Sequence, residues 1–413
     1  MMKLKTQNKR ILYSETNYDN REIYSVMKVL EDSPESLVLG KETKIFEKKI
    51  SKMFGKKFGV FVNSGSSANL LALSALNLKK KSEIITPALN FSTTVSPIIQ
   101  LGLIPHFVDI QLNTLNIDVK KIEYSINENT SAIMVPNLIG NIPDWEKINN
   151  LSKKYNLYLI EDSADTLGYS FKNGNTGKIS DIVTTSFYAS HIITCAGIGG
   201  MICTNNIDVY KNILVQRGWG RSSELFGKDN ALLSNKQLNE RFNMEIDGMK
   251  YDKKFLFEKL GYNFFAPEIC AAFGNVQLKK FKSLSKKRNV NFNYLKDKLK
   301  KFSKFLIFPF QHNFVETNWL AYPLILKKNN KDLDRNKLQK FLENKNIQTR
   351  PIFSGDITKH PMIQGHPYKS NSNKFDNALH VMKYGLLIGC HPKLKKEDFD
   401  RVLKALDEFF LKG

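Results

Sequence analysis

The sequence predicts an α/β protein in which a mainly parallel sheet is covered by helices on both faces and followed by a smaller C-terminal α+β domain. Short runs rich in β-branched and aromatic residues alternate with amphipathic segments between residues 58 and 204. This alternation is typical of parallel strands joined by crossover helices. A second, shorter set of strand and helix patterns begins near residue 317. The length of 413 residues also exceeds what one small core can organise.

Before the sheet, an N-terminal arm over residues 1–40 is expected to carry a helix at Ile23–Leu30, where apolar residues recur at helical spacing. A loop follows at Pro34–Gly40, which contains turn-forming residues. A second amphipathic helix, Thr43–Phe54, opens a large α/β domain that we place at residues 41–265. The alternation in this domain predicts strands at 58–62, 83–86, 106–110, 131–135, 157–160, 182–186 and 200–204, and helices at 68–76, 94–101 and 145–155.

The last part of the chain, residues 266–413, is expected to hold a long helix and the smaller domain. Residues 217–262 are polar and contain many turn formers, so no regular element is predicted there. The patterns that follow predict a long helix at 267–299, strands at 318–326 and 348–352, and helices at 333–344 and 396–410.

Composition argues against several classes of protein. The formal net charge is +22, but the lysines occur in twos and threes, so solvated faces are favoured over a nucleic-acid partner. No apolar run approaches the roughly 20 residues of a membrane span, and no secretory signal is visible. The cysteines form no Cys-x-x-Cys pair, so we expect no metal site, no disulfide framework and a cytoplasmic location. They are Cys195, Cys203, Cys270 and Cys390.

A turn of small residues, Asn63-Ser64-Gly65-Ser66-Ser67-Ala68-Asn69, lies between a predicted strand and a predicted helix. Small residues let the backbone approach a ligand, and the start of a helix offers free N–H groups to a phosphate. An ordinary capped helix explains the same residues equally well. The turn matches neither Gly-x-x-x-x-Gly-Lys nor Gly-x-Gly-x-x-Gly, which argues against nucleotide triphosphates and dinucleotides.

Two further strand ends carry side chains that could bind a cofactor. The strand at 157–160 is followed by Glu161-Asp162, and a carboxylate there could keep a pyridine nitrogen protonated. A metal ligand or a helix cap is the alternative for Asp162, and Asp165 is close enough to orient a neighbour. Phe91 follows another strand and could stack on a flat ring, although a core position is the default for an aromatic residue.

His191 follows the strand at 182–186 through Phe187-Tyr188-Ala189-Ser190 and precedes the glycine-rich run 197–200. A histidine after a strand is more often structural than catalytic. The phosphate-type turn and the acidic pair upstream change this balance. Together they indicate a pyridoxal-phosphate site in which histidine takes the place that lysine usually holds.

The order of these motifs resembles the DegT/DnrJ/StrS family of pyridoxal-phosphate enzymes, which act on nucleotide-linked keto sugars. The resemblance implies a fold-type I, aspartate aminotransferase-like fold and assembly as a homodimer. The matching residues cover nearly the whole chain and are Gly40, Glu47, 63–69, 87–94, 140–141, 161–168, 217–221, 261–263, 277–278, 349–351 and 389–392.

The resemblance also implies roles for individual residues. It makes His191 the catalytic residue and assigns a set of cofactor contacts. One of these, Asn263, is expected to reach the phosphate of the cofactor in a neighbouring subunit. Two arginines are candidate substrate ligands, since guanidinium pairs with carboxylates and diphosphates, although either could form a surface ion pair. The cofactor contacts within one chain are Gly65, Ser66, Ser67, Phe91, Asp162, Asp165 and Ser186, and the arginines are Arg221 and Arg350.

Histidine at this position separates the chain from the family's aminotransferases, which bind the cofactor covalently through a lysine there. An imidazole forms no stable Schiff base, but with a pKa near 6.5 it can act as a base and an acid at neutral pH. Lys172, Lys178 and Lys211 are the nearest lysines and fall outside the motif. Within the family, this histidine resembles the sugar 3-dehydratases, which hold pyridoxal or pyridoxamine phosphate non-covalently.

Two kinds of 3-dehydratase are distinguished by an iron–sulfur cluster. The cluster-bearing kind has a Cys-x-Cys after an Arg-Asp-Trp-Gly-Arg segment, and this chain has Ser223 and Leu225 at those places after Arg217–Arg221. The resemblance therefore favours the cluster-free kind. It implies removal of the C3 hydroxyl of a nucleotide-linked 4-keto-6-deoxy sugar, with L-glutamate as amino donor. A nucleotide-sugar aminotransferase and a non-catalytic sugar-binding relative stay open, as does the identity of the nucleotide.

Overall fold

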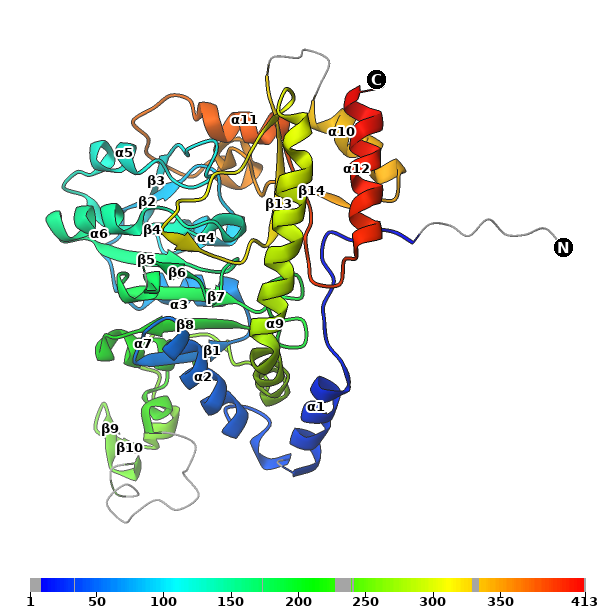
Figure 1. Ribbon diagram of the computed structural model, residues 1–413. Helices are drawn as coiled ribbons and strands as arrows, with labels where there is room; N and C mark the ends of the chain where they lie inside the picture. Colours follow the sequence, from blue (N-terminus) through cyan, green and yellow to red (C-terminus); the bar gives the residue numbers. More distant parts are fainter. Residues whose placement is uncertain are drawn as a thin grey trace.

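The computed structural model describes residues 9–32, 34–172, 174–226, 239, 241–328 and 334–411. Its centre is a seven-stranded sheet with the order β1-β8-β7-β5-β4-β2-β3 (Figure 1). All strands point the same way except β8, which runs antiparallel to β1 and β7. The strands are β1 Phe58–Val62, β2 Glu83–Pro87, β3 Ile104–Val108, β4 Thr130–Pro136, β5 Tyr158–Asp162, β7 Ile182–Ser186 and β8 Gly200–Thr204.

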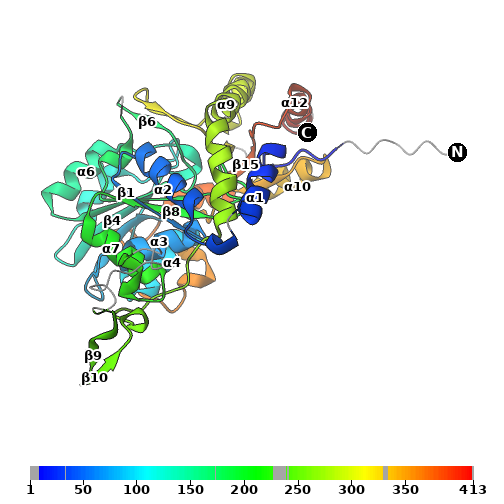
Figure 2. The ribbon, with the colours of Figure 1, turned by 90° about the horizontal axis from the view of Figure 1, so that it is seen from below.

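Helices cover both faces of this sheet (Figure 2). β2, β7 and β8 are buried at every position, which explains why apolar and polar residues do not alternate strictly in their sequences. One face is covered by α3 Gly65–Ser74, α4 Ser92–Gln100 and α7 Ile207–Arg217, and the other by α2 Lys41–Met53, α6 Trp145–Lys154 and the first part of α9 Glu268–Leu299.

A smaller antiparallel sheet with the order β11-β13-β15-β14 forms the C-terminal part. The long helix α9 passes from the large sheet to this part, where α12 lies beside it (Figure 1). The elements are β11 Leu306–Ile307, β13 Ala321–Leu326, α10 Arg335–Asn344, β14 Thr349–Pro351, α11 Asp376–Tyr384, β15 Gly385–Gly389 and α12 Lys396–Leu411.

The N-terminal residues run from the C-terminal part to the large sheet. Ile11 forms a parallel bridge with Ile347, and α1 Asn20–Asp32 packs against α9. The described chain also contains short elements, which include α5 Val119–Ile122, the paired strands β6 Ser170–Phe171 and β12 Val315–Glu316, and the hairpin β9 Met244–Ile246 with β10 Met249–Tyr251.

The predicted fold class is confirmed, with local differences. α3 begins three residues earlier than expected because the Ser64 hydroxyl accepts a hydrogen bond from the Ser67 amide and caps the helix at Gly65. The hairpin β9–β10 lies where no regular element was predicted, and Leu333, the expected start of α10, lies outside the described residues. None of the described helices is long and apolar enough to cross a membrane.

Candidate active site

The turn between β1 and α3 lies against the end of β7. Gly65 is the first residue of α3, and a Cβ added to it would stand 2.7 Å from the Cβ of Ser186, the last residue of β7. Only glycine therefore allows this close approach. Ser66 lines the adjoining cavity, whereas the Ser67 hydroxyl turns away and donates to Asn63 Oδ1 at 2.7 Å.

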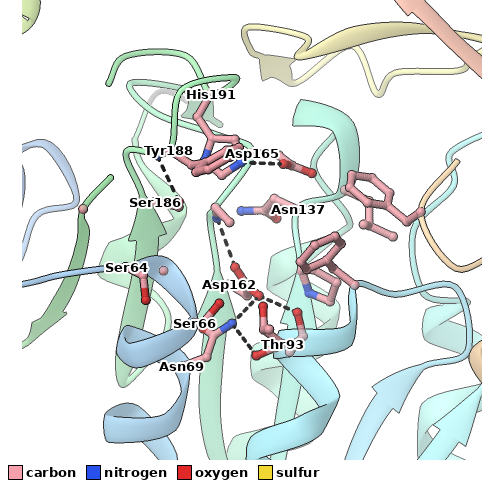
Figure 3. Close-up of a pocket in the computed structure, with 18 of the residues that line it drawn as sticks. Ser64, Ser66, Asn69, Thr93, Asn137, Asp162, Asp165, Ser186, Tyr188 and His191 are labelled. Atoms are coloured by element: carbon pink, nitrogen blue, oxygen red, sulfur yellow. Dashed lines mark hydrogen bonds and ion pairs between the residues drawn. The ribbon is translucent and has the colours of Figure 1, made fainter. Parts of the chain in front are cut away.

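Asp162, the last residue of β5, faces this cavity as a buried carboxylate. It accepts hydrogen bonds from Thr94 Oγ1 at 2.7 Å, Asn69 Nδ2 at 2.9 Å and the Ala164 amide at 3.0 Å (Figure 3). Burial raises the pKa of Asp162, and the bonds from Thr94 and Asn69 lower it. A cation placed beside Asp162 would favour the carboxylate form.

The neighbouring Glu161 takes no part in this site. Successive residues of a strand point to opposite faces, and Glu161 is fully buried on the other side of the sheet from Asp162. It accepts hydrogen bonds there from the hydroxyls of Ser163 and Thr176, each at 2.7 Å. Of the two adjacent acidic residues, Asp162 therefore belongs to the cavity and Glu161 to the core.

His191 lies at the wall of the cavity opposite Asp162, on the loop that joins β7 to β8 (Figure 3). Its Nε2 is 3.9 Å from Asp165 Oδ1, and its Nδ1 is buried without a hydrogen-bond partner among the described residues. Burial lowers the pKa of His191 to about 4 and raises the pKa of Asp165 to about 7. His191 is therefore a neutral base near pH 7, beside a carboxyl group that can hold or release a proton there.

Two connected cavities meet at His191. The inner cavity has a volume of about 290 Å³ and extends from the start of α3 to Asp162. The outer cavity, of about 440 Å³, extends toward Arg350 and the C-terminal part. The side chains that line both cavities are Phe91, Asp165, Tyr188, His191 and Phe353.

Arg221 and Asn263 are not brought to these cavities by the single chain. Arg221 forms an ion pair with Glu224 at 3.0 Å and places its guanidinium carbon 4.3 Å from the Trp219 ring centroid. Asn263 forms a backbone bridge with Gly218. Ser67 also lies outside the cavity lining, as a residue of the capped first turn of α3.

Sequence reasoning missed several residues that complete the site. Asn69 follows Gly65 by one helical turn, and its amide is oriented by Thr184 Oγ1, which donates to Asn69 Oδ1 at 2.6 Å. Thr94 lies in the first turn of α4, within the family-like segment 87–94, and has no sequence signal that sets it apart from an ordinary helix residue. The missed residues of the two cavities include Tyr13, Asn69, Thr94, Asn137, Tyr188 and Phe353.

The residues of the inner cavity fit pyridoxal phosphate. The first turn of α3 and Ser186 form a cradle for a phosphate, and glycine at position 65 keeps it open. Asp162 would meet the pyridine nitrogen, and Phe91, which is 51% exposed, presents its ring at the cavity wall in an edge contact with Phe353. His191 lines the same cavity, and its buried Nδ1 makes no hydrogen bond within the described residues.

The mostly parallel sheet, the smaller C-terminal part and this cavity define an aminotransferase-like α/β protein. The chain belongs to the DegT/DnrJ/EryC1/StrS aminotransferase family, which it matches over residues 17–407.

Three relatives show how far the similarity extends. The chain is 36% identical to the lipopolysaccharide biosynthesis protein RfbH of Salmonella typhimurium, over 91% of this chain and 86% of that protein. It is 33% identical to the GDP-4-keto-6-deoxy-D-mannose 3-dehydratase of Escherichia coli O55:H7, over 95% and 98% of the two chains. A solved GDP-4-keto-6-deoxymannose-3-dehydratase with a trapped PLP-glutamate geminal diamine superposes with a TM-score of 0.83 at 31% identity, covering 95% of this chain and 99% of that one.

Proposed function

We propose that this protein removes the C3 hydroxyl group of a nucleotide-linked 4-keto-6-deoxy sugar, with pyridoxal phosphate as cofactor and L-glutamate as amino donor. The observation that carries this proposal is His191, which stands at the junction of the two cavities. No lysine is among the described residues that line either cavity. These side chains therefore cannot form a Schiff base with the cofactor. A neutral imidazole instead lies at the junction of the cavities, where it can accept and donate protons.

The predicted cofactor is supported by both the family and the solved relative that carries it. When bound, pyridoxal or pyridoxamine phosphate supplies an electron-poor ring that stabilises negative charge developing on an attached carbon. Gly65, Ser66 and Ser186 would hold the phosphate through backbone and hydroxyl groups. Asp162 would hold the proton on the pyridine nitrogen, oriented by its hydrogen bonds from Thr94 and Asn69.

His191 would move the proton that the reaction requires. At neutral pH one ring nitrogen carries a lone pair that can accept a proton, because burial keeps the imidazole uncharged. It would take a proton from the C4′ carbon of the cofactor and deliver it to the leaving C3 hydroxyl of the sugar. Asp165, 3.9 Å away, would stabilise the imidazolium that exists between these two transfers.

The outer cavity would receive the sugar and, in the other half reaction, glutamate. Arg350 lies at this cavity and can pair with a carboxylate or a diphosphate. Overall, one glutamate and one keto sugar would give 2-oxoglutarate, ammonia and the 3-deoxy keto sugar. The C3 hydroxyl would leave as water, and the water released by condensation and elimination would equal the water consumed by hydrolysis. This stoichiometry requires no external oxidant or reductant.

A second subunit would complete the site. Phe91, Tyr188 and Ile198 line the inner cavity yet are 51%, 58% and 45% exposed. A homodimer that covers this mouth would place Asn263 of one chain near the cofactor phosphate of the other, and Arg221 close to that interface. The test of this arrangement is the oligomeric state by sedimentation, together with activity from mixing two inactive variants, His191→Asn and Asn263→Ala.

Product analysis tests the reaction. The protein is incubated with pyridoxal phosphate, glutamate and a panel of nucleotide-linked 4-keto-6-deoxy sugars, and the products are measured by mass spectrometry. We expect a product that has lost one oxygen, together with ammonia and 2-oxoglutarate. A product in which the ketone has become an amine would identify an aminotransferase, and binding without any product would identify a non-catalytic relative.

The role of His191 is tested by substitution. His191→Asn keeps a polar side chain of similar size but removes proton transfer, so we expect loss of the 3-deoxy product by at least 10²-fold with the cofactor still bound. His366→Asn, at an exposed position, is the matched control. Full 3-dehydratase activity in His191→Asn would refute the mechanism.

A further inference from the structure

Residues 9–19, which we call the N-terminal strap, connect the C-terminal part to the loop that carries His191. At one end, the amide of Ile11 donates to Asn346 O at 2.9 Å, and the amide of Gln348 donates to Ile11 O at 2.8 Å. At the other end, Thr16 Oγ1 donates to Ala189 O at 3.1 Å, two residues before His191. The strap is therefore held on both sides of the outer cavity.

The middle of the strap is seated closely on β15. A Cβ added at Gly389 would stand 2.7 Å from the carbonyl oxygens of both Leu12 and Tyr13. The His391 ring is within hydrogen-bond distance of Leu12 O, at 3.1 Å, and the Tyr13 amide donates to Gln348 Oε1 at 2.9 Å. These contacts fix the backbone of Tyr13 and determine where its side chain can lie.

Tyr13 lines the outer cavity, as do Asp165, His191 and Arg350. The guanidinium carbon of Arg350 is 5.7 Å from the centre of the Tyr13 ring. Within the described parts of the chain, the Tyr13 hydroxyl has no hydrogen-bond partner. Burial raises the pKa of Tyr13, so the phenol keeps its proton and can donate it in a hydrogen bond.

We propose that Tyr13 is a substrate-positioning residue, whose hydroxyl binds the hydroxylated sugar ring of a nucleotide-linked sugar in the outer cavity. This inference rests on the proposed function, because it assigns the outer cavity to the sugar. A phenol beside His191 and Asp165 suits a sugar hydroxyl, which can both accept and donate hydrogen bonds. Arg350, in the same wall, is left to pair with an anionic group.

The experiment compares the binding of two ligands to the cofactor-loaded protein by titration calorimetry. One ligand is a nucleotide-linked 6-deoxy sugar, and the other is the corresponding nucleoside diphosphate without the sugar. In Tyr13→Phe we expect the affinity for the nucleotide sugar to fall about 3- to 10-fold, as for the loss of one hydrogen bond. We expect unchanged affinity for the nucleoside diphosphate and an unchanged rate of cofactor amination by glutamate.

Tyr24→Phe serves as the control, because Tyr24 is 67% exposed on α1 and lines neither cavity. Equal weakening of both ligands by Tyr13→Phe would show a structural role and overturn the inference, as would unchanged binding of both. A wild-type protein that binds no nucleotide sugar would also overturn it. A wild-type protein that binds the sugar through Tyr13 but forms no 3-deoxy product would instead refute the proposed reaction and leave this contact established.

Discussion

Burial of His191 makes the stability of the cofactor-free protein depend on pH. The folded protein disfavours the imidazolium and lowers the pKa of His191 from 6.5 to about 4. Between these two values the unfolded chain binds a proton that the folded chain does not bind. The free energy of unfolding contributed by this group must therefore fall as the pH falls from about 6.5 toward 4.

The magnitude follows from the two pKa values. Proton linkage with pKa values of 6.5 and about 4 gives a loss of about 2 kcal/mol at pH 5, relative to pH 8. The side chain is only 16% exposed, so solvent screens this effect little. His391, whose pKa burial also lowers to about 4, contributes a second loss in the same direction.

The assay is urea unfolding at pH 7.5 and pH 5 of the wild type, His191→Asn and the exposed control His366→Asn, without added cofactor. Other titrating groups are common to the three proteins, so differences between the proteins isolate each histidine. We expect His191→Asn to lose about 2 kcal/mol less than the other two between these pH values. A parallel loss in all three proteins would refute the argument that His191 is buried in its neutral form.

Two further predictions concern the residues beneath the cofactor site. In Asp162→Asn, the proton on the pyridine nitrogen loses its partner, so cofactor amination by glutamate, followed by absorbance, should slow about 10²- to 10³-fold; unchanged kinetics would remove Asp162 from this role. Trp145 is fully buried and its Nε1 donates to Asn137 Oδ1 at 2.9 Å, so Trp145→Phe should lower the free energy of unfolding by about 1–3 kcal/mol, measured by urea unfolding. An unchanged urea midpoint would contradict this.

Much of the fold could be predicted from the sequence because its central strands are locally encoded. The strands Phe58–Val62, Ile182–Ser186 and Gly200–Thr204 have the predicted bounds, since each is a short run rich in β-branched, aromatic or other apolar residues. α7, which lies where the strand–helix alternation ends, was not predicted, and neither was β15, although it is a short buried apolar run between two glycines. The direction of β8, antiparallel to its neighbours, depends on how the chain crosses the sheet and has no local signal.

The site was predicted through the order of its motifs more than through their individual chemistry. Small residues at 63–69, a carboxylate at a strand end and a histidine before a glycine run each have ordinary structural explanations. Their combination is what indicated one cofactor. The separate roles of Glu161 and Asp162 follow from strand alternation, but hydrogen bonds from Asn69 and Thr94 to Asp162 depend on how α3 and α4 pack on the sheet.

The sequence by itself determined the fold class, the family and the presence of histidine where lysine is usual, because these are properties of residue order and identity. The tertiary structure decided which residues share a cavity and what ionisation state they prefer. Burial sets the neutral state of His191, and burial is a property of packing. The role of Tyr13 could not be predicted from the sequence for the same reason. Tyr13 is 178 positions away from His191, and only the path of the N-terminal strap brings both residues to one cavity.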